Sequence, residues 1–88
     1  MKPEPKKTKI ISSLHRIEVG ISTWSSKDRS IRNRYESKSG KFSPHGSSEI
    51  PLKDLRPIME VAAKHDLLDV KTCASIIEIL AKSVQRQK

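Results

Sequence analysis

The chain has 88 residues, a net charge of +8, 34% hydrophobic residues and only 3% aromatic residues. A chain of this size can bury only a small core, so we expect one small domain that gains further cover by forming a homodimer. No apolar run approaches the roughly 20 residues that span a bilayer, and the charged N-terminus lacks the apolar stretch of a secretory signal, so we predict no membrane association and a cytoplasmic, or in a eukaryote nuclear, location.

The positive charge is concentrated in the first half of the chain. Residues 1–48 hold eleven Lys and Arg against four Asp and Glu, a net charge of +7. Residues 49–88 hold seven against six, a net charge of +1. This asymmetry favours a surface for a polyanion in the first half. The alternative is a lysine-rich, solvated surface with a disordered tail.

The first elements in chain order are a tail and a strand. Residues 1–8 contain two prolines and three lysines without apolar periodicity, which predicts a flexible basic arm before a single domain over residues 9–88. Ile17, Val19 and Ile21 alternate with more polar residues, the period of a half-buried strand. The polar residues 25–28 then predict a hairpin turn.

Short extended segments continue to about residue 51. A second strand is expected over about residues 30–36, followed by a turn over 37–40 that ends in glycine. Lys41 and Phe42 would begin a third short strand. Residues 43–48 are expected to form a loop, and residues 49–51 a brief edge strand, where proline is tolerated.

The pattern then changes to helix. Asp54 is a plausible N-cap, with Pro57 inside the first turn, where its missing N–H costs nothing. That helix should end near His65, before the break at residues 66–69, and a second should run over about 70–85. The second helix carries an amphipathic stripe made of Val70, Cys73, Ile77, Leu80 and Val84. Strands followed by helices predict an α+β class, with a small sheet of about four strands, then two amphipathic helices, in a dimer.

The residue types do not favour catalysis. His15, His45 and His65 have no metal-ligand spacing with another His, Cys or carboxylate, although His45 could touch a phosphate from its loop. Cys73, the single cysteine, excludes a multi-cysteine zinc site and is expected to be a small apolar residue of the helical stripe. The three glycines form no phosphate-binding loop. We therefore predict no enzyme, no metal and no cofactor.

Aromatic and basic residues instead gather in the strand-rich half, where cations can neutralise phosphates and rings can stack on unpaired bases. Trp24 is out of phase with the apolar strand positions, which makes it the favoured stacking ring, whereas the rings of Tyr35 and Phe42 could equally complete a small core. Strand alternation also puts Arg32 on the face opposite Tyr35. The candidate nucleic-acid-binding residues are Trp24, Lys27, Arg29, Arg32, Arg34, Tyr35, Lys38, Lys41 and Phe42.

At these residues the chain resembles the positive cofactor 4, or transcriptional coactivator p15, family of single-stranded-DNA-binding domains. The resemblance covers about residues 16–65, with one extra residue around Ser48. Trp24 falls at the family's ring position and Lys27 at its basic turn position. Further matches at nearly the family's spacing are Ile31-Arg32, Tyr35, Gly40, Pro44 and Ile50-Pro51-Leu52.

The resemblance implies a curved antiparallel sheet backed by helices. It also implies dimerisation that joins two sheets into one groove for two antiparallel unpaired strands. Two departures stand out: Ser43 and Ser47 replace the loop lysines of the family, and the helix over about 70–86 extends beyond the usual single helix. The serines would weaken the grip on phosphates, and the added helix could enlarge a dimer interface.

The sequence thus predicts non-enzymatic, largely sequence-independent binding of single-stranded DNA, or of RNA, in transcription, replication or repair. Its partners would be the nucleic acid, a second copy of the chain and components of the transcription or replication machinery. The alternative is a small regulatory protein that binds another protein through its helical half. Duplex-DNA binding by a helix-turn-helix is disfavoured by the near-neutral charge of residues 49–88.

Overall fold

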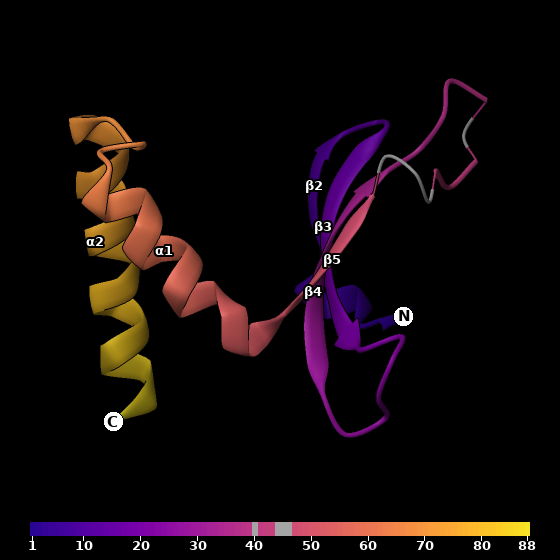
Figure 1. Cartoon of the computed structure of the whole chain (residues 1–88), viewed down its shortest axis with the longest axis horizontal. Coiled ribbons are helices and arrows are strands. Elements are labelled where there is room, and N and C mark those ends of the chain that lie inside the picture. The colour runs from indigo at the N-terminus through magenta and orange to yellow at the C-terminus, as the bar shows by residue number, and fades with distance from the viewer. Residues whose placement is uncertain (40, 44–46) are drawn as a thin grey trace. The chain divides into compact units, whose positions relative to one another are not determined.

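The computed structural model describes residues 1–39, 41–43 and 47–88 (Figure 1). All strands precede the two α-helices, and the sheet is antiparallel throughout, so the predicted α+β class is confirmed. Within these residues the sheet has five strands rather than about four, and it is not closed into a barrel.

The sheet is built on a central hairpin of β3 (His15–Ile21) and β4 (Arg29–Tyr35). Strand β5 (Ser48–Pro51) pairs with the outer side of β4. Two short strands, β1 (Lys2–Pro3) and β2 (Lys9–Ser12), pair with successive stretches of β3. Because β3 and β4 are antiparallel, the connections before and after β4 lie at opposite ends of the sheet (Figure 1).

The N-terminal segment has more structure than its composition indicates. Besides β1, it contains a 3₁₀ turn over Pro5–Lys7. A Cβ on Gly20 would lie 2.2 Å from the carbonyl oxygen of Lys2, so only glycine lets β1 lie this close to β3. The predicted flexible basic arm over residues 1–8 thus contains a short strand and a 3₁₀ turn. Its flexibility stays a prediction.

The strands predicted over about residues 30–36 and 49–51 agree with β4 and β5 to within one residue at each end. The alternating segment predicted from Ile17 onward begins earlier, at His15, and ends at Ile21, and β2 before it is a separate strand. One predicted strand is missing from the described residues. The segment beginning at Lys41 and Phe42 forms no strand, because Phe42 makes only a single β-bridge with Glu36. The backbone N–H of Ser43 donates to the carbonyl oxygen of Tyr35 at 3.0 Å, and the strand that pairs with β4 on this side is β5.

The two helices begin and end close to their predicted positions. A 3₁₀ turn over Leu52–Asp54, where an N-cap is predicted, leads directly into α1 (Leu55–Lys64). Asp66 then takes a left-handed conformation with φ of 51°, which interrupts the helical backbone between α1 and α2 (Val70–Gln87). No helix in the described part of the chain is long and apolar enough to cross a membrane.

Asp69 is the N-cap of α2, a signal that the sequence analysis does not use. Its carboxylate accepts a hydrogen bond from the backbone N–H of Thr72 at 2.7 Å. Hydrogen bonds from the Thr72 side chain and backbone hold the pKa of Asp69 below its usual value, because they stabilise the charged carboxylate.

Contacts divide the chain into two compact units, Met1–Leu55 and Arg56–Lys88, where the sequence analysis has one domain over residues 9–88. Among the described residues, no apolar side chain is buried. The buried residues are instead polar or charged: Glu18, Ser22, Ser30 and Arg32. Ile17, Val19, Ile31 and Ile50 of the sheet are partly buried, whereas many large apolar side chains of the helices are exposed. Folding of this single chain therefore leaves apolar surface, mainly that of the helices, accessible to other molecules.

Candidate nucleic-acid interface

The register of the β3–β4 hairpin sorts the sheet residues into two faces. Glu18 lies opposite Arg32, and Val19 lies opposite Ile31 on the other face. The predicted separation of Arg32 from Tyr35 is confirmed by this register. We call the face that carries Glu18 the polar face; its residues are Arg16, Glu18, Ser30, Arg32, Arg34 and Glu49. We call the face that carries Val19 the apolar face; its residues are Ile17, Val19, Ile31, Tyr35 and Ile50.

The polar face is centred on the carboxylate of Glu18, which is 2% exposed. Its Oε1 accepts hydrogen bonds from Nε and Nη2 of Arg32 at 3.0 and 2.8 Å. Arg16 and Arg34 also lie within ion-pair distance of Glu18, at 3.5 and 3.8 Å. The same two arginines approach Glu36 at 3.3 and 3.6 Å. Three guanidinium groups and two carboxylates therefore form one network with a small net positive charge.

Phe42 covers part of this network. Its ring centroid lies 4.8 Å from the guanidinium carbon of Arg32 and 4.6 Å from that of Arg34, distances typical of cation–π contacts. Arg32 is only 8% exposed. The Phe42 ring therefore lies against Arg32 and Arg34, and both arginines approach Glu18. This arrangement stabilises the sheet and leaves little of Arg32 accessible to a phosphate.

Tyr35 lies on the opposite face and already has a stacking partner. Its ring is parallel to that of His15, with 4.1 Å between centroids and 11° between planes. The His15 Nε2 is hydrogen-bonded to Oδ1 of Asn33, which fixes the imidazole beside Tyr35. The three aromatic residues singled out by sequence are thus distributed over three separate places: Tyr35 on the apolar face, Phe42 over the polar face, and Trp24 in the loop between β3 and β4.

Trp24 lies beside an open hollow of about 260 Å³ at one end of the sheet. The Trp24 side chain is 52% exposed. The lining combines the indole and two apolar residues with three cations and one carboxylate: Trp24, Lys27, Asp28, Arg29, Pro51, Leu52 and Lys53. Of the cations, Arg29 is paired with the carboxylate of Glu4, whereas the ammonium groups of Lys27 and Lys53 form no ion pair with a described residue.

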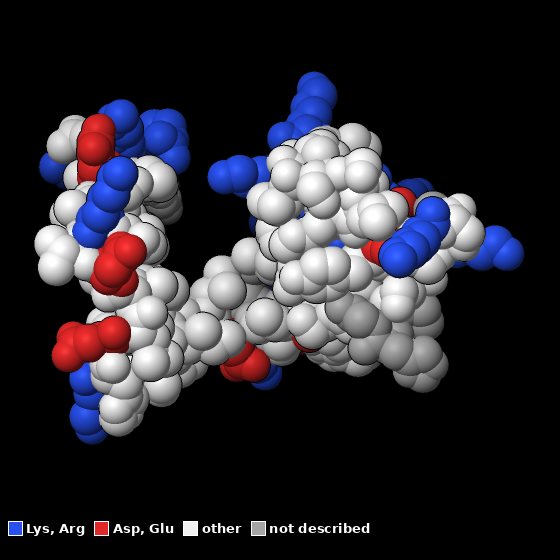
Figure 2. Space-filling view, turned by 90° about the horizontal axis from the view of Figure 1, so that it is seen from above, with Lys and Arg blue, Asp and Glu red and all other residues white. Residues whose placement is uncertain are grey.

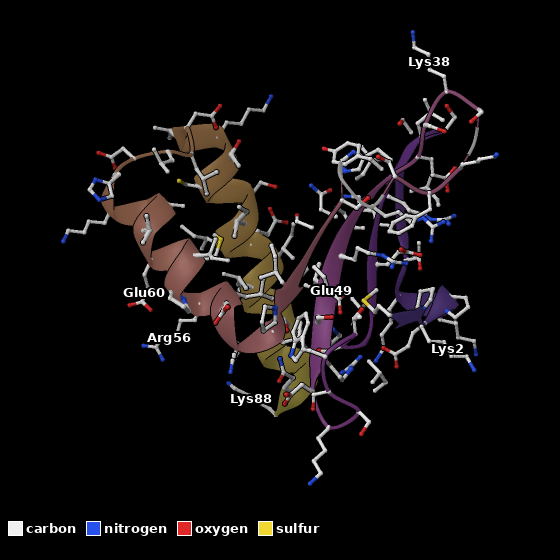
Figure 3. The ribbon with its side chains drawn as sticks, turned by 45° about the vertical axis from the view of Figure 1, so that its right-hand side comes forward. Lys2, Lys38, Glu49, Arg56, Glu60 and Lys88 are labelled. Atoms are coloured by element: carbon white, nitrogen blue, oxygen red, sulfur yellow. The ribbon has the colours of Figure 1, made fainter. Side chains whose placement is uncertain are left out.

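Glu49 of β5 anchors the loop that carries Trp24 (Figure 3). Its carboxylate accepts hydrogen bonds from the backbone N–H and the hydroxyl of Thr23 at 2.8 and 2.7 Å, and from the hydroxyl of Ser30 at 2.7 Å. Burial opposes ionisation of Glu49, but the hydrogen bonds from Thr23 and Ser30 outweigh it and hold the pKa of Glu49 below 4.5. Because the folded-state pKa is lowered, this anchor stabilises the fold fully above about pH 4.5 and is lost as the pH falls through the lowered value.

Lys38 and Lys41 lie in the connection after β4, at the end of the sheet opposite Trp24. Lys38 extends away from the strands near the tip of this loop (Figure 3). Gly40 and residues 44–46 lie outside the described residues, and with them the predicted turn glycine and the suggested phosphate contact of His45.

The sequence did not indicate that Pro51 of β5, and Leu52 and Lys53 of the turn after it, line the hollow. Lys53 stands in the near-neutral half of the sequence, and only the pairing of β4 with β5 brings it beside Lys27 and Trp24. The polar face could have been suspected earlier, since Glu18 is out of phase with Ile17 and Val19 on the same strand.

The surface charge follows the division into units. In Figure 2 the Lys and Arg side chains of the strand-bearing unit extend outward with little Asp or Glu on the face shown, whereas both signs occur side by side on the helical unit. Residues 1–55 hold twelve Lys and Arg against six Asp and Glu, a net charge of +6. The hollow therefore belongs to the more basic unit, which favours an anionic ligand.

Within the described ranges, no three His, Cys, Asp or Glu gather closely enough to hold a metal ion. The resemblance to the positive cofactor 4 family rests on short motifs in the sequence. No family model, no curated protein and no solved structure matches the chain.

Proposed function

We propose that this protein is a non-enzymatic binder of single-stranded nucleic acid, DNA or RNA, acting in transcription, replication or repair. The observation that carries the proposal is the hollow in which the exposed Trp24 indole lies beside Lys27 and Lys53. A ring for one unstacked base and cations for the adjoining phosphates are the two features that such binding needs.

The roles within the proposed site follow from the contacts. Trp24 stacks on a base, and Lys27 and Lys53 neutralise phosphates. Arg29 joins them when a phosphate replaces its exposed partner, Glu4. Farther from the hollow, Lys38, Lys41 and the N-terminal lysines add non-specific attraction. The network of Arg32, Arg34 and Phe42 supports the sheet that presents the hollow.

The proposal predicts binding that favours single strands and depends on salt. A labelled oligonucleotide titrated at several salt concentrations should bind more tightly than a duplex of equal charge. The logarithm of its binding constant should fall against that of salt concentration with a slope of roughly −0.7 per phosphate neutralised. An RNA of the same sequence tests the choice of sugar. Equal binding of single strands and duplex, or no binding of either, contradicts the proposal.

We further propose that two copies of the chain associate through their apolar surfaces. Large apolar side chains of α1 and α2 are exposed, among them Ile58, Val70, Ile77, Leu80 and Val84. A groove of about 610 Å³ in the helical unit is lined by some of them, together with Leu68 and Cys73. This unit carries charges of both signs, so a second copy meets little net repulsion.

Light scattering over a range of protein concentrations measures this association. We expect the molar mass of a dimer, twice the 10.0 kDa of the chain, and we expect Ile77→Asp to shift the mass towards that of a monomer, whereas Ser75→Asp, on the same helix without an apolar side chain, should not. A wild-type monomer would overturn the dimer and favour the alternative function, a regulatory protein whose helical half binds a different protein.

A further inference from the structure

The hollow beside Trp24 contains one acidic side chain, Asp28, whose presence the binding of phosphates does not explain. The other ionisable residues that line the hollow, Lys27, Arg29 and Lys53, are all cations. A carboxylate there reduces the attraction for a phosphate, so a site that only gripped a nucleic-acid backbone would be better without it.

The structural roles open to Asp28 are taken by other groups. The loop is closed by the Asp28 backbone, whose carbonyl oxygen accepts a hydrogen bond from the N–H of Ser22 at 3.0 Å, and this contact needs no carboxylate. Arg29, the adjacent cation, pairs with Glu4 instead. Within the described part of the chain, the Asp28 carboxylate has neither an ion pair nor a hydrogen bond, although Asp28 and three cationic residues line the same hollow.

The size and chemistry of the hollow suit one base. A volume of about 260 Å³ lies below the range of pockets that enclose drug-sized ligands, which fits a single planar base against the indole better than a dinucleotide. An ionised carboxylate accepts hydrogen bonds and donates none. It can therefore pair only with a base edge that presents N–H groups.

We propose that Asp28 makes this hollow selective for guanine. The Watson–Crick edge of guanine presents two adjacent N–H donors, which match the two oxygens of a carboxylate. Cytosine and adenine present one amino group beside an acceptor. Thymine and uracil present a single N–H between two carbonyl oxygens, which a carboxylate repels. The inference rests on the proposed binding of single strands, and it turns a site without sequence preference into one that ranks bases in the order guanine, then cytosine and adenine, then thymine or uracil.

Quenching of Trp24 fluorescence by short oligonucleotides tests the proposal, because Trp24 is the only tryptophan of the chain. The probes are a thymine heptamer and the same heptamer with one central guanine, cytosine or adenine. We expect the guanine probe to bind about 5- to 150-fold more tightly than the thymine heptamer, the discrimination of one good bidentate contact. Asp28→Asn should reduce this ratio to near one without weakening the thymine heptamer.

Asp54→Asn is the matched control, since it removes the same charge from the same unit at a residue that does not line the hollow. It should preserve the guanine preference. Equal binding of the guanine and thymine probes by the wild type, or a preference that survives in Asp28→Asn, overturns the role of Asp28. If no heptamer binds the wild type, the proposed function itself fails, and the two failures are thereby distinguished.

Discussion

Glu18→Ala is expected to lower the free energy of unfolding by about 3–5 kcal/mol, the cost typical of removing one partner from a buried ion pair. The carboxylate of Glu18 is the shared partner of Arg16, Arg32 and Arg34. Without it, Arg16 and Arg34 keep an ion pair with Glu36, whereas Arg32 keeps none with a described residue. The nearly buried Arg32 then loses both of its hydrogen bonds to Glu18.

Urea unfolding at one fixed protein concentration measures this loss, since the stability of an associating protein depends on concentration. Glu78→Ala is the matched control, because the ion pair of Glu78 with Lys82 lies exposed on α2 and an exposed helical pair contributes only about 0.3–0.5 kcal/mol. Glu18→Gln, which keeps the shape and one acceptor, should have an intermediate effect. A loss below about 1 kcal/mol in Glu18→Ala would mean that the network does not hold the sheet together.

Trp24→Ala is expected to weaken the binding of single-stranded oligonucleotides by about 5- to 150-fold, which corresponds to the roughly 1–3 kcal/mol of one base stacked on an aromatic ring. The indole is more than half exposed beside the hollow and has no ring partner among the described residues. Its loss therefore removes a ligand contact and little internal packing. Trp24→Phe should recover part of the affinity, because a smaller ring still stacks.

Fluorescence anisotropy of a labelled oligonucleotide measures the affinities of these variants. Phe42→Ala is the matched aromatic control: its ring contacts Arg32 and Arg34, so its loss should change affinity far less. Lys27→Ala tests the cations separately and should flatten the salt dependence by roughly one phosphate contact. Unchanged affinity in Trp24→Ala, with the salt dependence intact, would remove stacking from the mechanism and leave only electrostatic attraction.

These two predictions separate two uses of arginine and aromatic residues that look alike in the sequence. Residues on β4 and after it were candidates for phosphates and bases, yet Arg32 contacts both the Phe42 ring and the buried Glu18. Trp24 and Lys27, in the loop, have no such internal partners among the described residues. The difference arises from burial, because a charge inside the sheet needs a counter-charge, whereas a charge on the loop is solvated and can exchange water for a ligand.

The register of the hairpin shows why the polar face could not be derived from the pattern alone. A four-residue turn over 25–28, as the sequence analysis expects, would place Glu18 opposite Tyr35. The connection between β3 and β4 is longer and covers residues 22–28, so Glu18 lies opposite Arg32. Register depends on loop length, and a shift by an odd number of residues turns every side chain of one strand to the other face relative to its partner strand.

The sequence by itself determined the elements whose signals are local. Alternation marked β3, the break at residues 66–69 separated the two helices, and the periodic stripe marked α2, because side-chain spacing along one segment sets which face can be apolar. Only the tertiary structure decided which residues meet across segments: Glu18 with Arg32, and Lys53 with Trp24. Such contacts depend on loop lengths and on the register in which strands pair. Small free-energy differences between registers decide which pairing forms, so no single segment encodes these contacts.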